Sequence, residues 1–257
     1  MDLGFRLTSL CLAFTIAAGL VPLPDPSGWA PAPPEPPPIT APGPPPVQPG
    51  AGMEDVSPSD WFYDAIRVGV RHGFVRPMEG RFAPQQPITR GAFITMLGRM
   101  HAALGGVIGY DRIPDLPYTD ITADADYIPY LAWATEVQIV LGDAEQRFSP
   151  ESSITREEMA VLLVHYIDAY ALYDQLDVDP DSPHIYDYGF YADWFDISDW
   201  AWDEVHLLRY FHLMQGQEVE PGVYFFYPQE QVLRLEAVAI LVRLFEALFD
   251  GPSGAAL

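Results

Sequence analysis

The sequence predicts a mainly α-helical fold of three helix-loop-helix repeats. Three observations predict it. The motif Phe-x-Pro-x5-Arg occurs three times. Apolar residues recur at helical spacing on both sides of each motif. Hydrophobic residues make up 49% of the 257 residues, which is enough to build a buried core.

The first segment, residues 1–20, is predicted to be a signal peptide. Arg6 precedes an apolar run from Leu7 to Val21, and the small residues Ala17 and Gly19 would occupy the −3 and −1 positions of a cleavage site. The run is shorter than the roughly 20 residues of a membrane-spanning helix. An uncleaved membrane anchor is the alternative, and only in that case would the protein contact a membrane.

Residues 21–52 are predicted to be a proline-rich linker. Between residues 22 and 50, 14 of 29 positions are proline, which excludes helices and sheet ladders and favours extended polyproline II. The segment is interpreted either as a stalk that holds the folded part away from a surface or as an unstructured tail. The sequence does not separate the two.

The repeats are predicted at residues 53–110, 116–175 and 193–250, with an acidic connecting loop at 176–192 and a tail at 251–257. Each contains an Asp followed by a β-branched residue, then an aromatic residue, then the motif. The Asp residues are Asp55, Asp120 and Asp196, the aromatic residues are Trp61, Tyr127 and Trp200, and the motifs run from Phe82 to Arg90, Phe148 to Arg156 and Phe226 to Arg234.

Each repeat is expected to contain one helix before the motif and one after it. Glycine and proline residues in the intervening segments break the helical pattern. The expected helices run from Trp61 to His72, Thr89 to Met100, Tyr130 to Val137, Thr155 to Tyr170, Trp200 to Phe211 and Leu233 to Phe249. A brief strand at 139–141 is the most β-structure that the pattern allows.

The arginine of each motif begins a helix, where a cation is opposed by the helix dipole. In the second repeat, Thr155 and Glu158 form a predicted capping box around Arg156. A helix N-terminus offers free N–H donors, and an added guanidinium would make a bidentate site for a carboxylate or phosphate. The alternative is that each arginine pairs with one of the many acidic residues.

Together these motifs resemble S-layer homology repeats, over about residues 53–250. The second repeat carries the resemblance best, with Tyr118-Thr119-Asp120-Ile121, Ile139-Val140-Leu141-Gly142, Phe148-Ser149-Pro150 and Ile154-Thr155-Arg156-Glu157-Glu158. The resemblance implies one pseudo-threefold helical domain, a central helix bundle with grooves between neighbouring repeats. It also implies a bacterial protein of the cell wall or S-layer.

The resemblance further implies a function without catalysis: binding an anionic, often pyruvylated, secondary cell-wall polysaccharide attached to peptidoglycan. Arg90, Arg156 and Arg234 would hold the acidic group, with Thr89 and Thr155 beside them. Trp61, Tyr127 and Trp200, with the turn glycines Gly142 and Gly216, would shape the grooves. Self-association or an unknown surface protein would be further partners.

Several positions depart from the family pattern. Ala92 stands in place of glutamate, Arg76-Pro77 in place of the glycine turn, Tyr127 in place of tryptophan and Leu233 in place of the capping threonine. No repeat is complete, so the three sites are expected to be unequal. Arg156, in the repeat with the intact capping box, is expected to be the best of them.

Charge and composition exclude several functions. The formal net charge of −23 opposes nucleic-acid binding. All 13 basic residues are arginine, which excludes lysine chemistry, and Cys11 is the single cysteine. No cofactor or metal site is predicted, and Asp177, Asp179 and Asp181 form a poor calcium loop because prolines interrupt it.

Two alternative functions remain. One is an acidic scaffold for extracellular proteins, and the other is a carboxylate-based hydrolase of wall glycans.

Overall fold

The computed structural model describes residues 53–109, 115–179, 182, 185 and 190–249. The predicted signal peptide, the proline-rich linker and the tail lie outside the described residues, as does part of the acidic loop. Within the described residues, no helix is long and apolar enough to cross a membrane. The helices are α1 (Tyr63–Arg71), α2 (Arg90–Ala103), α3 (Ile128–Glu136), α4 (Arg156–Ala169), α5 (Trp202–Tyr210) and α6 (Arg234–Phe249).

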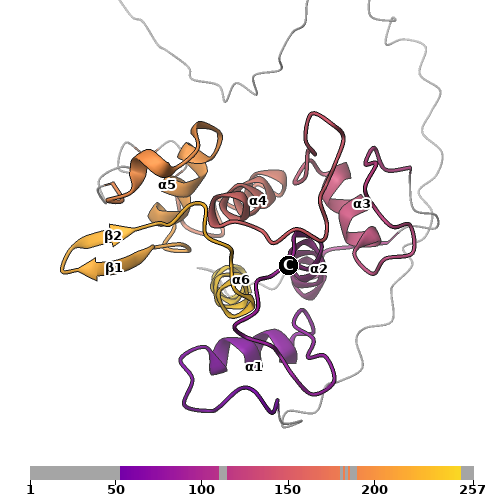
Figure 1. The fold of residues 1–257 in the computed structure, drawn as a ribbon, viewed down its shortest axis with the longest axis horizontal. Helices are drawn as coiled ribbons and strands as arrows, with labels where there is room; N and C mark the ends of the chain where they lie inside the picture. The colour runs from indigo at the N-terminus through magenta and orange to yellow at the C-terminus, as the bar shows by residue number, and fades with distance from the viewer. Residues whose placement is uncertain (1–52, 110–114, 180–181, 183–184, 186–189, 250–257) are drawn as a thin grey trace, which may run out of the picture. The chain divides into compact units, whose positions relative to one another are not determined.

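The predicted mainly helical, threefold architecture is confirmed. The second helix of each repeat, α2, α4 or α6, lies at the centre, and Figure 1 shows these three nearly end-on. The first helix of each repeat, α1, α3 or α5, lies outside. Each outer helix packs against the central helix of the preceding repeat: α3 on α2, α5 on α4 and α1 on α6. The chain therefore interlocks its repeats in a ring.

The central helices are buried on most of their surface because they pack against one another and against an outer helix. Phe93 and Leu97 of α2, Leu163 of α4, and Val238 and Leu241 of α6 are fully buried in one continuous core. The outer helix α1 buries chiefly Ile66 and Gly69. In the first and third repeats the central helix is accordingly the more apolar of the two, whereas in the second repeat the outer helix α3 is more apolar than α4.

Three backbone hydrogen bonds close the ring just before the central helices begin. The N–H of Ile88 donates to Val232 O at 2.9 Å, that of Val232 to Ile154 O at 2.9 Å, and that of Ile154 to Ile88 O at 3.0 Å. Each repeat thus donates once and accepts once. The N-termini of α2, α4 and α6 are held together at this end of the molecule.

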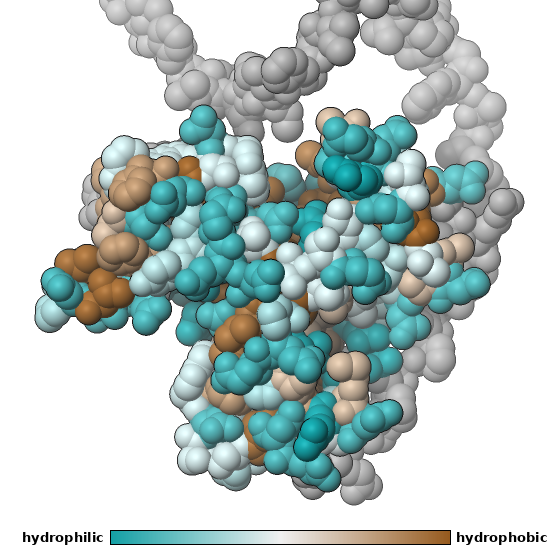
Figure 2. Space-filling view, in the orientation of Figure 1, coloured by the Kyte–Doolittle hydropathy of each residue, from teal (hydrophilic) through white to brown (hydrophobic). Residues whose placement is uncertain are grey.

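One element was not predicted from the sequence. The loop of the third repeat contains an antiparallel hairpin of β1 (Gln217–Glu220) and β2 (Val223–Phe225). Gly222 lies in its turn with φ of 80°. Val219 and Val223 are exposed there, and Figure 2 shows apolar surface over the hairpin tip. The consecutive β-favouring residues Val223, Tyr224 and Phe225 were the available β signal.

Candidate functional site at the junctions between repeats

Each motif arginine lies at a junction between two repeats. The arginine Nε donates to the carbonyl oxygen of the motif phenylalanine in the next repeat. The three distances are 2.8 Å for Arg90 to Phe148, 2.6 Å for Arg156 to Phe226 and 2.9 Å for Arg234 to Phe82. The guanidinium carbon also lies over the same phenylalanine ring, at 5.2, 5.1 and 5.0 Å from its centroid. Because Arg234 reaches back to the first repeat, the set is closed.

The first N–H groups of the central helices are occupied at these junctions. Arg90 N donates to Ser152 O and Gly91 N to Pro150 O, both at 2.9 Å. The other two junctions repeat this arrangement, with Arg156 N bonded to Glu230 O, Glu157 N to Pro228 O, Arg234 N to Gln86 O and Leu235 N to Pro84 O. The expectation that these helix N-termini offer free backbone donors is therefore wrong at the first two positions of each helix.

The loop that receives each arginine is fixed by an aspartate. Asp55 accepts from the N–H groups of Phe82 and Ala83, at 2.9 and 2.7 Å. Asp120 and Asp193 do the same for Phe148 and Ser149 and for Phe226 and Tyr227. The residue after each phenylalanine has a left-handed φ of 57–58°, and the aspartate stabilises that turn.

Asp193, not Asp196, is the third of these aspartates. The prediction of Asp196 is wrong because that residue lies at the end of a short 3-10 helix, Trp194–Asp196, and is exposed. Asp193 is 3% exposed. Burial opposes ionisation of Asp55 and Asp120, but the two backbone N–H groups that each accepts outweigh it and lower their pKa values.

The three guanidinium groups differ in their ion pairs. Arg90 Nη1 lies 3.1 Å from Glu158 Oε1, and Arg156 Nη1 lies 3.6 Å from Glu236 Oε1. In both cases the glutamate belongs to the capping position of the next repeat. The next repeat after Arg234 is the first, where Ala92 stands at that position. Arg234 makes no ion pair with any described residue, and burial lowers its pKa from the ordinary arginine value.

The capping residues also differ. Thr89 Oγ1 accepts from Ala92 N at 3.2 Å, and Thr155 with Glu158 forms the predicted capping box. Leu233 has no hydroxyl group, so in α6 only the reverse bond exists, from Leu233 N to Glu236 Oε2 at 2.9 Å. The N–H of Glu236 has no acceptor among the described residues outside its helix. At the junction of repeats three and one, therefore, the arginine lacks an ion pair and the helix lacks a capping acceptor among the described residues. We call this the least saturated junction.

The aromatic residues singled out from the sequence occupy two different environments. Trp61 and Trp200 are 69% and 56% exposed, whereas Tyr127 is 8% exposed. Each tryptophan directly precedes the N-cap residue of an outer helix, while Tyr127 is itself the N-cap residue. The sequence alignment of Tyr127 with Trp61 is therefore shifted by one residue, and Asp126 occupies the exposed place.

Gly142 and Gly216 adopt φ values of 74° and 75° after the outer helices. A Cβ at Gly142 would lie 2.8 Å from Tyr118 Cε1, and one at Gly216 would lie 2.7 Å from Tyr191 Cε1. These glycines therefore make room for the buried tyrosine two residues before each loop-fixing aspartate. Tyr191 was missed in the sequence, although Tyr191-Ala192-Asp193 repeats the aromatic-x-Asp pattern of Tyr118.

A buried carboxylate at the second junction was also missed. Glu157 is 2% exposed and accepts from Ser198 N at 3.0 Å, Ser198 Oγ at 2.9 Å and Gln229 Nε2 at 2.7 Å. These bonds tie repeat two to repeat three. At the equivalent position the first repeat has Gly91, which packs against Tyr127. Among the described residues, no group of three acidic, histidine or cysteine side chains could hold a metal ion.

The junction geometry defines a closed ring of three repeats with one arginine at each interface. The S-layer homology domain model matches residues 53–94 and 117–160, which are in the first two repeats. The chain is also 24% identical, over 200 residues, to Cell surface glycoprotein 1 of Acetivibrio thermocellus. That alignment covers 76% of this chain and 8% of the relative, so the chain spans a small part of the relative's length.

Proposed function

We propose that this chain is a non-catalytic cell-surface module that attaches to an anionic secondary cell-wall polysaccharide on peptidoglycan. The two matches to the S-layer homology domain and the similarity to a cell surface glycoprotein support the surface role. The acidic group of the polymer, such as a pyruvate ketal carboxylate, is the proposed ligand. Its site is the junction of repeats three and one.

The ion-pair pattern carries this proposal. Arg90 and Arg156 are already neutralised by Glu158 and Glu236. A polymer carboxylate would have to displace those glutamates. Arg234 has no such competitor among the described residues, because position 92 is alanine. A bidentate carboxylate on its guanidinium would supply the missing ion pair.

This assignment changes which of the three arginines is expected to bind the acidic group best. The intact capping box had favoured Arg156, but the same box places Glu158 against Arg90, and Glu236 occupies Arg156. The departures from the family pattern, Ala92 and Leu233, are what leave Arg234 without the glutamate ion pair of the other two arginines and α6 without a capping hydroxyl. Trp61, which precedes the outer helix packed on α6, is an exposed aromatic ring and a proposed sugar contact of this site; Trp200 is also exposed but lies at the junction of repeats two and three, where it would be a sugar contact outside the Arg234 site.

The decisive test is Ala92→Glu, measured by co-sedimentation of the full chain with cell-wall sacculi before and after acid removal of the polymer. The new carboxylate is expected to pair with Arg234, as Glu158 pairs with Arg90, and to weaken polymer binding by about ten- to a hundredfold, the value of a charge-assisted hydrogen bond. Unlike Arg234→Ala, this change leaves the arginine's bond to Phe82 in place.

Ala92→Gln is the matched control, since it adds the same bulk without the charge and should bind within a few fold of the unaltered chain. Binding of Ala92→Glu at the unaltered affinity would contradict the Arg234 site. Binding that persists after the polymer is removed would contradict polymer recognition. In that case the acidic-scaffold function would become the better explanation.

A further inference from the structure

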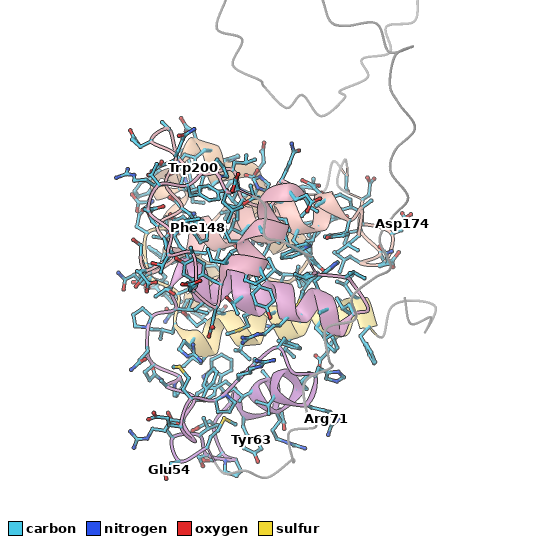
Figure 3. All side chains as sticks on the ribbon, turned by 90° about the vertical axis from the view of Figure 1, so that its right-hand side faces the viewer. Glu54, Tyr63, Arg71, Phe148, Asp174 and Trp200 are labelled. Carbon is cyan, nitrogen blue, oxygen red and sulfur yellow. The ribbon has the colours of Figure 1, made fainter. Side chains whose placement is uncertain are left out.

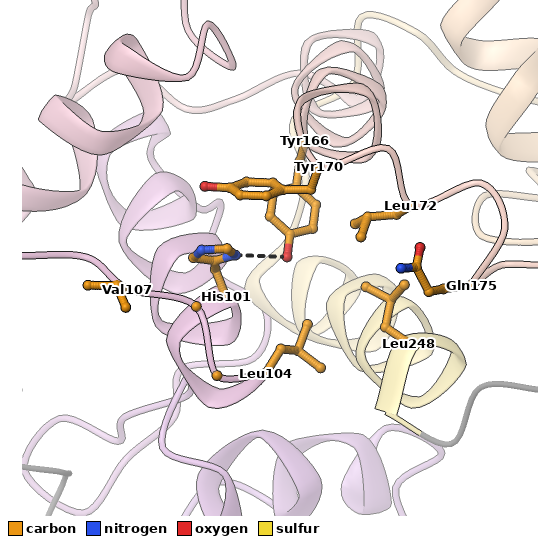
Figure 4. A pocket seen from close by; sticks show the side chains of 10 residues that line it. His101, Leu104, Val107, Tyr166, Tyr170, Leu172, Gln175 and Leu248 are labelled. Atoms are coloured by element: carbon orange, nitrogen blue, oxygen red, sulfur yellow. Dashed lines mark hydrogen bonds between the residues drawn. The ribbon is translucent and has the colours of Figure 1, made fainter. Parts of the chain in front are cut away.

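A cavity of about 390 Å³ lies at the end of the central bundle opposite the arginines. Its walls come from the C-terminal parts of α2, α4 and α6 and the segments that follow α2 and α4, with His101, Leu104, Tyr166, Leu172, Gln175 and Leu248 among its lining residues (Figure 4). In Figure 3, Phe148 and Trp200 lie toward one side of the molecule and Asp174 toward the other. The cavity is therefore separate from the proposed polymer site.

None of the described residues that line this cavity carries a charged side chain. His101 is 8% exposed, and burial lowers its pKa to about 4, so the imidazole is neutral above that pH. Burial also raises the pKa of Tyr166. The ring of His101 packs against Tyr170 and Trp133, with centroid distances of 4.4 and 5.2 Å. A charged ligand would lose its hydration here without meeting an opposite charge.

Among the described residues, the cavity contains one buried acceptor that no donor reaches. Gln175 Oε1 is buried and has no hydrogen-bond partner among the described residues. Tyr170 Oη already accepts from Trp133 Nε1 at 2.7 Å, and Tyr166 Oη lies 3.3 Å from His101 Nδ1. The three central helices also direct their negative ends toward this part of the molecule. A buried unpaired acceptor costs about 1–3 kcal/mol, which a ligand donor would recover.

We propose that this cavity binds a small uncharged molecule with an apolar ring and one hydroxyl or amide donor, which donates to Gln175 Oε1. The volume lies within the range of small-molecule sites. Leu104, Leu172 and Leu248 provide apolar contacts for the ring, and the His101 and Tyr170 rings, tilted by 33° to each other, provide aromatic contacts. This site is independent of polymer attachment, and either one could exist without the other.

The test uses phenol as the probe with the full chain, measured by ligand-observed NMR titration and by the shift in Tm. Toluene has the same ring without the donor, and benzoate and benzylammonium carry opposite charges. Phenol is expected to bind at least three times more tightly than toluene, and the two ions are expected not to bind. A ligand that binds only the folded chain raises its Tm in proportion to its occupancy.

Gln175→Met removes the acceptor while keeping the length of a half-buried side chain. It is expected to weaken phenol binding three- to tenfold and to leave toluene binding unchanged, which distinguishes loss of the donor bond from loss of the cavity. Equal effects on both probes would overturn the proposal, as would phenol binding no better than toluene.

Two further outcomes would also overturn it. Preferential binding of benzylammonium would identify an aromatic site for cations. Failure of every probe at millimolar concentration, in a chain whose helicity is intact, would mean that water alone fills the cavity.

Discussion

At the scale of single residues, three aspartates shape the loops that receive the arginines. Asp55, Asp120 and Asp193 each satisfy two backbone N–H groups in a turn with a left-handed residue. Each turn positions the phenylalanine carbonyl that the arginine Nε contacts. The aspartate therefore acts on the junction indirectly, by fixing the acceptor of the arginine.

Asp193→Ala is predicted to lower the free energy of unfolding by about 3 kcal/mol, because it leaves the N–H groups of Phe226 and Tyr227 without an acceptor in a buried setting. Asp196→Ala, at an exposed position three residues away, is predicted to change it by less than about 0.5 kcal/mol. Urea denaturation followed by circular dichroism measures both. Equal losses in the two variants would contradict the assignment of Asp193.

The contrast between Asp193 and Asp196 also shows what the sequence could reveal at this scale. Both residues lie near Ile197, and an Asp followed by isoleucine matched the pattern of the other repeats better. The choice depends on a short 3-10 helix that places Asp196 outward, and such a turn has no strong sequence signal. The arginines were found from the sequence, but their ion pairs depend on the neighbouring repeat.

At the scale of secondary-structure elements, the six helices follow from apolar periodicity, and their predicted ends lie within a few residues of those observed. The partner of each outer helix does not follow from periodicity. An apolar stripe shows that a helix is half-buried but not which helix covers it. Here each outer helix packs on the central helix of the preceding repeat, so the packing unit differs from the sequence repeat.

Two glycines of the third repeat allow a matched test of the turn after the outer helix. Gly216→Ala is predicted to destabilise the protein by about 3 kcal/mol or more. The left-handed φ costs about 1–2 kcal/mol, and the new Cβ would lie 2.6 Å from Phe225 O and 2.7 Å from Tyr191 Cε1. Gly222→Ala has a similar φ with open space around it, and only the smaller cost of about 1 kcal/mol is expected.

Thermal unfolding of the two glycine variants beside the unaltered chain provides the measurement. A loss in Gly216→Ala no larger than in Gly222→Ala would show that Tyr191 and the hairpin can move aside at little cost. The cost of a side chain at position 216 would then come from the left-handed backbone conformation alone, and the close contacts with Phe225 and Tyr191 would contribute nothing.

At the scale of the whole molecule, the ring makes the repeats depend on one another. Removing the third repeat would leave the Ile88 N–H without Val232 O, the Ile154 O without its donor, and Arg156 without Phe226. It would also expose the apolar faces of α1 and α4 that α6 and α5 cover. Each repeat contributes surface that only its neighbours can bury.

A chain ending at residue 178 is therefore predicted to lose native helicity throughout, including α2 and α3, which it still contains. The full chain is predicted to unfold in one transition, with the same midpoint by circular dichroism and by tryptophan fluorescence. A truncated chain that keeps the helicity and cooperative unfolding of its remaining residues would show that two repeats are sufficient and that the ring is not needed for folding.

The ring also explains why the position of the least saturated junction was not predicted from the sequence. By equivalence with the other two junctions, the residue that corresponds to the glutamate partner of Arg234 is at position 92, which lies 142 residues earlier in the chain. The loss of glutamate at that position was visible in the sequence as a defect of the first repeat. Its effect falls on the third repeat, and only the closure of the ring connects the two.

On the proposed function, the residue at position 92 also helps to set how many arginines can bind the polymer at once. A wall polymer presents the same acidic unit many times, and a chain with one open arginine holds it through a single contact, so its residence time depends on that contact alone. Glu158 and Glu236 occupy the other two arginines as ion-pair partners. Removing these glutamates would allow three arginines to bind the polymer at once, and simultaneous contacts commonly raise avidity by about 10²- to 10⁴-fold. Three side chains, one in each repeat, thus determine whether attachment is exchangeable or lasting.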